Sequence, residues 1–203
     1  MMTSKAVFLD KDGPLIEDVP YNVNPDRIRL AEGAYKSLRL LQDRGYQLFV
    51  VTNQSGVARG FFEEQNLQQV RNKIIELLAS AGIFLTDFYY CPHHPHGKVS
   101  KYAVDCFCRK PQPGMLYRAA LEHDVNLAES WMVGDILYDI EAGNQAGCRT
   151  VLIDNGHETE WEVTPRREPE FTVGNLESAA RVIVWESLVR TEVKSWQEKT
   201  ATF

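Results

Sequence analysis

The stretch VFLDKDGPL, Val7–Leu15, sets two carboxylates directly behind a short apolar run. Its first three residues favour a β-strand that is buried on both faces. Asp10 and Asp12 then follow two positions apart, where that strand should end. Buried strands of this kind are typical of an open parallel sheet, in which ligands bind beyond the carboxyl ends of the strands.

Further runs rich in valine, isoleucine and aromatic residues recur along the chain. They predict strands at residues 6–10, 47–52, 84–90, 130–135 and 149–154, with a last short strand near Phe171. Apolar residues at helical spacing predict helices at 31–45, 63–82, 115–123 and 138–146, and a terminal helix from Leu176. The alternation predicts an α/β fold, a Rossmann-like parallel sheet with helices on both faces.

The segment from Cys91 to Gly114 breaks this alternation, because it has little periodicity and holds several prolines. A loop of this length inside a compact domain is usually functional or needs a staple. We therefore expect a single domain at residues 1–190 that contains a metal-stapled loop insertion at 91–108. Residues 191–203 would form a C-terminal helix extension or tail.

Composition limits the classes of partner. The chain has 203 residues, a formal net charge of −6 and scattered lysines and arginines, so no basic surface for nucleic acid or an anionic membrane is expected. No apolar run approaches the length of a membrane span, and the first residues lack a secretory signal. These features predict a cytoplasmic protein, which we expect to be a monomer, with a small-molecule partner.

Polar residues follow most of the predicted strands. Asp10 and Asp12 follow the first strand, Thr52 closes the second, Asp135 closes the fourth, and Lys110 ends the long loop. In an open parallel sheet these side chains should converge. Carboxylates, a hydroxyl and a lysine are suited to Mg²⁺ and a phosphate, since Mg²⁺ commonly binds through one or two carboxylates and substrate phosphate. The pattern predicts a phosphoryl-transfer site.

The long loop carries a second possible metal site. Cys91 and His93, then Cys106 and Cys108 after twelve intervening residues, offer four ligands in two close pairs. Four such ligands complete a tetrahedral zinc shell and leave no position for water, so the zinc would be structural. On spacing alone, the neighbouring histidines His94 and His96 compete with His93. The remaining cysteine, Cys148, lies apart and is predicted as a small core residue.

Four motifs, FLDKDG, VVTNQSG, CRKPQPG and VGDILYD, stand in this order along the chain. Together they resemble the motifs of the haloacid dehalogenase superfamily of aspartate-nucleophile phosphatases. Within it, TNQSGVARG and the cysteine-containing loop are similar to the D-glycero-D-manno-heptose 1,7-bisphosphate phosphatases, which remove the 7-phosphate. The resemblance implies the haloacid dehalogenase fold and a Mg²⁺-dependent reaction, and favours His93 as the fourth zinc ligand.

The resemblance also implies a role for each matching residue. Asp10 would be the nucleophile that becomes an aspartyl phosphate, and Asp12 the general acid and base. Mg²⁺ would be bound by the Asp10 carboxylate, the Asp12 backbone carbonyl and Asp135. Thr52 and Lys110 would hold the phosphoryl oxygens. The expected substrate-binding residues are Asp18, Tyr21, Asn53, Gln54, Ser55 and Arg109.

Two positions depart from the family pattern. Pro14 replaces the usual threonine after the first motif, which removes one backbone N–H. Ile136 replaces a lysine that often follows the fourth-motif aspartate, so one contact to the second phosphate of a sugar is absent. These departures bear on the substrate, and a histidinol-phosphate phosphatase or a catalytically silent sugar-phosphate-binding homologue remain the alternatives.

Overall fold

Strand β1 (Lys5–Leu9) lies inside a six-stranded parallel sheet in the computed structural model, which describes residues 4–200. The order across the sheet is β3-β2-β1-β4-β5-β6, and every neighbouring pair is parallel. The other strands are β2 (Tyr46–Asn53), β3 (Asp87–Cys91), β4 (Trp131–Gly134), β5 (Arg149–Ile153) and β6 (Phe171–Val173). The predicted α/β fold with a parallel sheet is confirmed.

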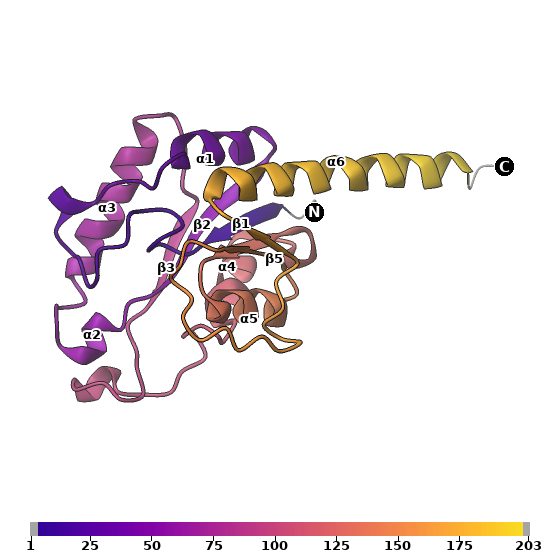
Figure 1. Ribbon diagram of the computed structural model, residues 1–203. Coiled ribbons are helices and arrows are strands. Elements are labelled where there is room, and N and C mark those ends of the chain that lie inside the picture. Colours follow the sequence, from indigo (N-terminus) through magenta and orange to yellow (C-terminus); the bar gives the residue numbers. More distant parts are fainter. Residues whose placement is uncertain (1–3, 201–203) are drawn as a thin grey trace.

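The helices cover both faces of this sheet (Figure 1). They are α1 (Ala34–Asp43), α2 (Gly56–Arg59), α3 (Asn66–Ala79), α4 (Gly114–His123), α5 (Leu137–Ala146) and α6 (Leu176–Thr200). Short 3₁₀ turns lie at Pro25–Arg27, Ser100–Tyr102 and Leu127–Glu129. The predicted helices are present with slightly different ends, whereas α2 has only four residues and was not predicted.

Alternation along β1 explains the two layers. Val7 and Leu9 are fully buried in one cluster with α1, α3 and α6, and Ala6 and Phe8 in another with α4 and α5. Because successive side chains of a strand point to opposite faces, an unbroken apolar run is required where helices cover both sides. The core therefore fixes β1 and leaves its carboxyl end, at Asp10, as the edge where polar groups can meet.

Strand β3 begins at Asp87, so the prediction of a strand from residue 84 was wrong for the first three positions. Phe84 is 72% exposed, and its backbone N–H donates to Gln42 Oε1 at 2.7 Å rather than to β2. The ladder with β2 starts where Phe49 pairs with Asp87. The segment 84–86 has apolar residues typical of a strand, but it lies in a surface connection and is not part of the β2–β3 ladder.

Helix α6 leaves the body of the molecule at its C-terminal end (Figure 1). Among the α6 side chains whose burial is described, at residues 176–190, 192 and 193, the last buried one is Val184, and the helix continues to Thr200. Part of the expected extension at 191–203 is thus helical, residues 201–203 lie outside the described part, and the domain boundary at residue 190 stays a prediction. Within residues 4–200, no helix is both long and apolar enough to cross a membrane.

Candidate active site and cysteine-histidine cluster

A lysine and three carboxylates meet at the carboxyl ends of β1 and β4. Asp10 directly follows β1, and Asp135 follows β4, its neighbour in the sheet. Asp139 reaches them from the first turn of α5, and Lys110 arrives from the long loop. One oxygen from each of Asp10, Asp135 and Asp139 lies within 4.8 Å of the others. The convergence expected from the order of the strands is present in the structure.

Lys110 is buried and holds two of these carboxylates. Its Nζ lies 2.5 Å from Asp10 Oδ1 and 2.5 Å from Asp139 Oδ1, and donates to the Val51 carbonyl at 2.8 Å. Burial lowers the pKa of Lys110, but the carboxylates of Asp10 and Asp139 outweigh it, so the net pKa is raised. The ammonium therefore stays charged beside Asp10.

Asp12 has a different environment from Asp10, although only one residue separates them. Lys11 Nζ lies 2.8 Å from Asp12 Oδ1, and Gln54 Nε2 donates to Asp12 Oδ2 at 3.2 Å. Burial raises the pKa of Asp12, an effect that Lys11 opposes and Asp10 reinforces. Two adjacent carboxyl groups with different surroundings can hold protons differently, which acid-base chemistry needs.

Gln54 connects Asp12 to β2. The same Nε2 that donates to Asp12 also donates to Thr52 Oγ1 at 2.9 Å, and Thr52 is 1% exposed. Thr52 thus lies at the end of β2 beside the paired aspartates, where the sequence predicted it. Lys11, which is buried and forms an ion pair with Asp12, was not predicted as part of the site.

Asn53 binds the backbone of Lys110 through both groups of its side-chain amide. Its Nδ2 donates to the Lys110 carbonyl at 2.9 Å, and its Oδ1 accepts from the Lys110 N–H at 3.0 Å. These bonds tie the end of β2 to the long loop and position Lys110. Binding of substrate by Asn53 stays a prediction.

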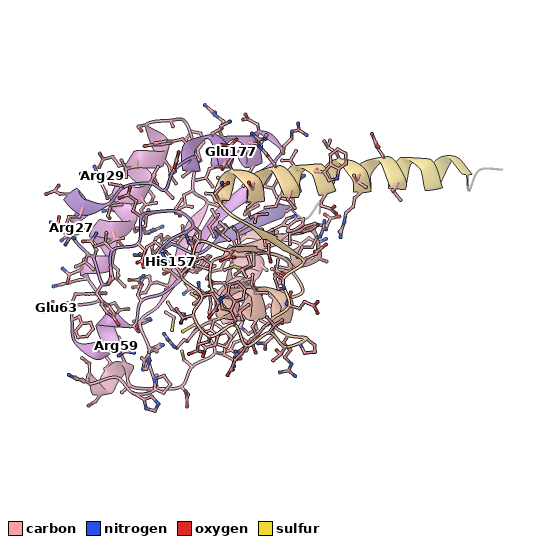
Figure 2. All side chains as sticks on the ribbon, viewed as in Figure 1. Arg27, Arg29, Arg59, Glu63, His157 and Glu177 are labelled. Atoms are coloured by element: carbon pink, nitrogen blue, oxygen red, sulfur yellow. The ribbon has the colours of Figure 1, made fainter. Side chains whose placement is uncertain are left out.

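Asp135 is held by residues that follow β5. Its Oδ2 lies 2.6 Å from His157 Nδ1 and accepts from Asn155 Nδ2 at 3.1 Å. Burial raises the pKa of Asp135 to about 6, reinforced by Asp10 and opposed by these two hydrogen bonds. Sequence reasoning missed both partners, because the loop after β5 carries no motif. Figure 2 shows His157 near the middle of the molecule, away from Arg59 beside α2.

Gly13 allows the first motif to approach Asp135 closely. A Cβ at Gly13 would lie 1.9 Å from Asp135 Oδ2, and the residue has φ +90°, a conformation that favours glycine. The loop is closed on either side of Pro14, since Gly13 N–H donates to the Ile16 carbonyl at 2.9 Å and Ile16 N–H to Lys11 at 3.0 Å. The turn therefore forms without an N–H at position 14.

The carboxylate cluster suits a divalent cation. Asp10, Asp135 and Asp139 bring three carboxylates against one lysine, and oxygen donors of this type are those that Mg²⁺ prefers. Burial raises the pKa of Asp139, and the nearby Asp10 and Asp135 add to this while Lys110 opposes it. The carboxylate of Asp12 is engaged with Lys11, which agrees with the expectation that only its backbone carbonyl binds metal.

A cavity of about 250 Å³ opens beside Asp12. Five of the six predicted substrate-binding residues line it: Asp18, Tyr21, Asn53, Gln54 and Ser55. Tyr21 packs edge-on against Phe61, with ring centroids 4.6 Å apart, at the mouth of this region. Arg109 lies elsewhere, in a larger hollow of about 690 Å³ that Lys110 also lines, and donates to the His93 carbonyl at 3.2 Å.

The four predicted zinc ligands come together in the long loop. Sulfur atoms of Cys91, Cys106 and Cys108 lie 3.1–3.5 Å apart, and His93 Nδ1 lies 3.7 Å from Cys91 Sγ and 3.4 Å from Cys108 Sγ. Zinc–sulfur bonds of about 2.3 Å imply tetrahedral edges of about 3.8 Å, so the spacing suits one zinc ion. The competing His94 instead contacts Arg59 at 3.1 Å.

Comparison with known proteins identifies the family. A family model described as HAD-hydrolase-like matches residues 107–179. The D-glycero-β-D-manno-heptose-1,7-bisphosphate 7-phosphatase of Haemophilus ducreyi is 45% identical over 157 residues, which cover 76% of this chain and 86% of that protein. The chain belongs to the heptose-bisphosphate phosphatase family of HAD-like hydrolases. A relative from Photorhabdus laumondii named as the α-anomer enzyme is 35% identical, covering 76% of this chain and 85% of that protein.

A solved structure agrees with this membership of the heptose-bisphosphate phosphatase family. The D,D-heptose 1,7-bisphosphate phosphatase of B. bronchiseptica, in complex with magnesium and phosphate, has a TM-score of 0.73 and 30% sequence identity. The match covers 90% of this chain and 99% of that one. The fold and the class of enzyme, a phosphoric monoester hydrolase, are therefore those of the family.

Proposed function

We propose that this protein is a magnesium-dependent phosphatase that hydrolyses the 7-phosphate of D-glycero-D-manno-heptose 1,7-bisphosphate through an aspartyl phosphate. The observation that carries the proposal is the buried Lys110 between Asp10 and Asp139, with the Asp12 carboxyl beside them. Such an arrangement pairs one carboxylate with a buried ammonium group and places it near another carboxyl group whose pKa is raised. The relatives of the same name support the substrate.

In the first step Asp10 attacks phosphorus, and the bond to the sugar oxygen breaks. Lys110 holds the attacking carboxylate in place through the 2.5 Å contact between its Nζ and Asp10 Oδ1. Asp12 gives its proton to the leaving oxygen, a task for which a raised pKa is suited. The products of this step are the sugar with a free hydroxyl and phosphorylated Asp10.

In the second step water attacks the phosphorus of the aspartyl phosphate, the bond between phosphorus and the Asp10 oxygen breaks, and inorganic phosphate leaves the free Asp10 carboxylate. Asp12, now deprotonated, takes the proton from that water and is restored to its starting form. In both steps Gln54 holds the Asp12 carboxyl group, because Gln54 Nε2 donates a hydrogen bond to Asp12 Oδ2. Thr52 and Lys110 stabilise the oxygens over which the transferring phosphoryl group spreads its charge.

We assign the magnesium site to Asp10, the Asp12 backbone carbonyl and Asp135, with Asp139 adjacent. When bound, the ion would offset the repulsion between the anionic nucleophile and the anionic phosphate. His157 and Asn155 hold Asp135 through its Oδ2 and so fix the orientation of that carboxylate.

We also propose that Cys91, His93, Cys106 and Cys108 hold one structural zinc ion. Cys108 immediately precedes Arg109 and Lys110, so the position of the metal-bound loop determines where both cations lie. Arg109 would contact the part of the substrate farthest from the reacting phosphate. The cavity beside Asp12, lined by Asp18 and Tyr21, would receive the sugar.

A panel of phosphate-release assays tests the substrate. The substrates are both anomers of heptose 1,7-bisphosphate, histidinol phosphate and simple sugar monophosphates, each with Mg²⁺ present. We expect kcat/KM for the β anomer of the bisphosphate to exceed that for histidinol phosphate by about a hundredfold or more. A preference for histidinol phosphate would overturn the proposed substrate. If no compound released phosphate, the proposed phosphatase activity would be wrong.

A further inference from the structure

Helix α6 carries two apolar stripes on opposite sides. The inner stripe is buried in the core together with α1 and consists of Leu176, Ala179, Ala180, Ile183 and Val184. The outer stripe faces solvent, with Trp185 66% exposed, Leu188 47% exposed and Val189 37% exposed. Because the body of the protein already occupies the inner side, it cannot cover the outer stripe as well.

The length of α6 makes this exposure more significant. The helix has 25 residues and spans about 37 Å, and residues 185–190, 192 and 193, the described side chains after Val184, are not buried. Figure 1 shows its C-terminal half continuing past the end of the sheet. Short helices without tertiary contacts are only marginally stable in water, so a helix that projects in this way is expected to pack against another element.

The outer face has a pattern that is complementary to itself. Arg181, Trp185, Leu188 and Glu192 lie at positions i, i+4, i+7 and i+11, which places them along one side of the helix. The order is cation, apolar, apolar, anion, with the same spacing from either end. Reversing the helix therefore brings Arg181 opposite Glu192 and Trp185 opposite Leu188.

We propose that two copies of this chain associate through antiparallel pairing of their α6 helices. A two-fold axis between positions 186 and 187 would place the apolar residues at the centre and one Arg181–Glu192 ion pair at each end. This isologous arrangement uses the same patch on both subunits. Glu186 is not part of that patch, since it contacts Arg149 at 2.7 Å on the body side.

A second copy fits this stripe better than an unrelated occupant. A membrane surface would require a broad apolar face with basic flanks, whereas this stripe is narrow and has Arg181 at one end and Glu192 at the other. In the antiparallel pair, each charged residue of one copy faces the opposite charge on the other copy, and each apolar residue faces an apolar residue. The proposed dimer is an alternative to the monomer that the sequence predicts, and it would leave the two active sites independent.

Sedimentation velocity of the full-length protein over a range of concentrations tests the dimer. We expect a reversible dimer for the unaltered chain and a monomer for Trp185→Glu, which places a charge at the centre of the pair. Leu121→Glu is the matched control, because Leu121 is 84% exposed on α4, outside the stripe. An unaltered protein that stays monomeric at every concentration would overturn the proposal.

Charge reversal tests the antiparallel register. Arg181→Glu and Glu192→Arg should each raise the dimer dissociation constant about tenfold, since like charges then meet at both ends, and the double reversal should restore it. Arg181 also contacts Glu177 at 2.5 Å within its own helix, so circular dichroism and phosphate release must stay unchanged in each variant. A dimer that is indifferent to the single reversals would contradict this pairing.

Discussion

The carboxylate cluster at the strand ends and the cysteine-histidine cluster in the loop reach their geometry by different means. Asp10 and Asp135 are placed by β1 and β4, whose ladder pairs Leu9, the residue before Asp10, with Val133, two residues before Asp135. Cys106 and Cys108 lie outside the strands and α-helices and are brought to Cys91 by the path of the loop. A sheet holds its functional residues without assistance, whereas an irregular loop needs a staple.

Asn53 joins these two regions. It ends β2, and its side-chain amide makes two hydrogen bonds to the backbone of Lys110, two residues after Cys108. Two contacts therefore position Lys110. Asn53 connects it to the sheet, and Cys108 connects it to the cysteine-histidine cluster of the long loop. The comparison predicts that three properties can be impaired separately: the reaction at Asp10, the metal-dependent structure of the long loop, and the positioning of Lys110 that links the two regions.

The largest expected effect is on chemistry alone. Asp10→Asn removes the nucleophile but keeps the size of the side chain, so phosphate release should fall at least about a thousandfold. The thermal unfolding midpoint should change little, since the sheet positions residue 10. Steady-state phosphate release and differential scanning calorimetry provide the two readouts. Substantial turnover by this variant would remove Asp10 from its proposed role.

An intermediate effect is expected from the loop. Cys106→Ser should lose bound zinc, lower Tm by about 5–10 °C, corresponding to about 2–3 kcal/mol for a chain of this size, and reduce activity. Metal content by mass spectrometry, Tm and phosphate release would be measured on the same sample.

Cys148→Ala is the matched control for the loop variant. Cys148 is buried in the core beside α4 and α5 and is not one of the four residues that could hold the metal ion, so its removal should leave the zinc content unchanged. Two outcomes would contradict the proposal that a zinc ion stabilises the loop: Cys106→Ser keeps one zinc per chain, or it loses zinc with no change in Tm and activity.

The smallest effect tests the coupling between the two regions. Asn53→Leu removes both hydrogen bonds to Lys110 and should lower kcat about tenfold to a hundredfold, because the lysine shifts relative to Asp10. Zinc content should remain at one ion per chain. If instead KM rose with kcat unchanged, Asn53 would act on substrate binding, as the sequence first indicated.

The sequence was sufficient to predict features that depend on local patterns. The apolar runs located β1, β2, β4 and β5, because strands covered on both faces need continuous apolar residues. The aspartates at the strand ends followed from the topology of an open sheet. The four residues of the cysteine-histidine cluster were predicted from their spacing together with the family resemblance, which favoured His93 over His94.

Features that depend on contacts between distant segments were not predictable in this way. The ion pair of Lys110 with Asp139 and the contacts of His157 with Asp135 join residues more than twenty positions apart and carry no periodic signal. The exposed Phe84 resembled a strand residue because composition does not record backbone pairing. Helix α2 is too short for helical spacing to be recognised.

The place of β1 within the sheet has a consequence for synthesis of the chain on the ribosome. β1 is synthesised before the other strands of this sheet and can pair with β2 early, yet its other edge stays unpaired until β4 is made, since Val7 pairs with Trp131. Contacts between such distant positions form slowly, and a nascent chain meanwhile exposes an unpaired edge. Nascent chains that stop before β4 should therefore need chaperones, and, because they lack Asp135, they should not release phosphate.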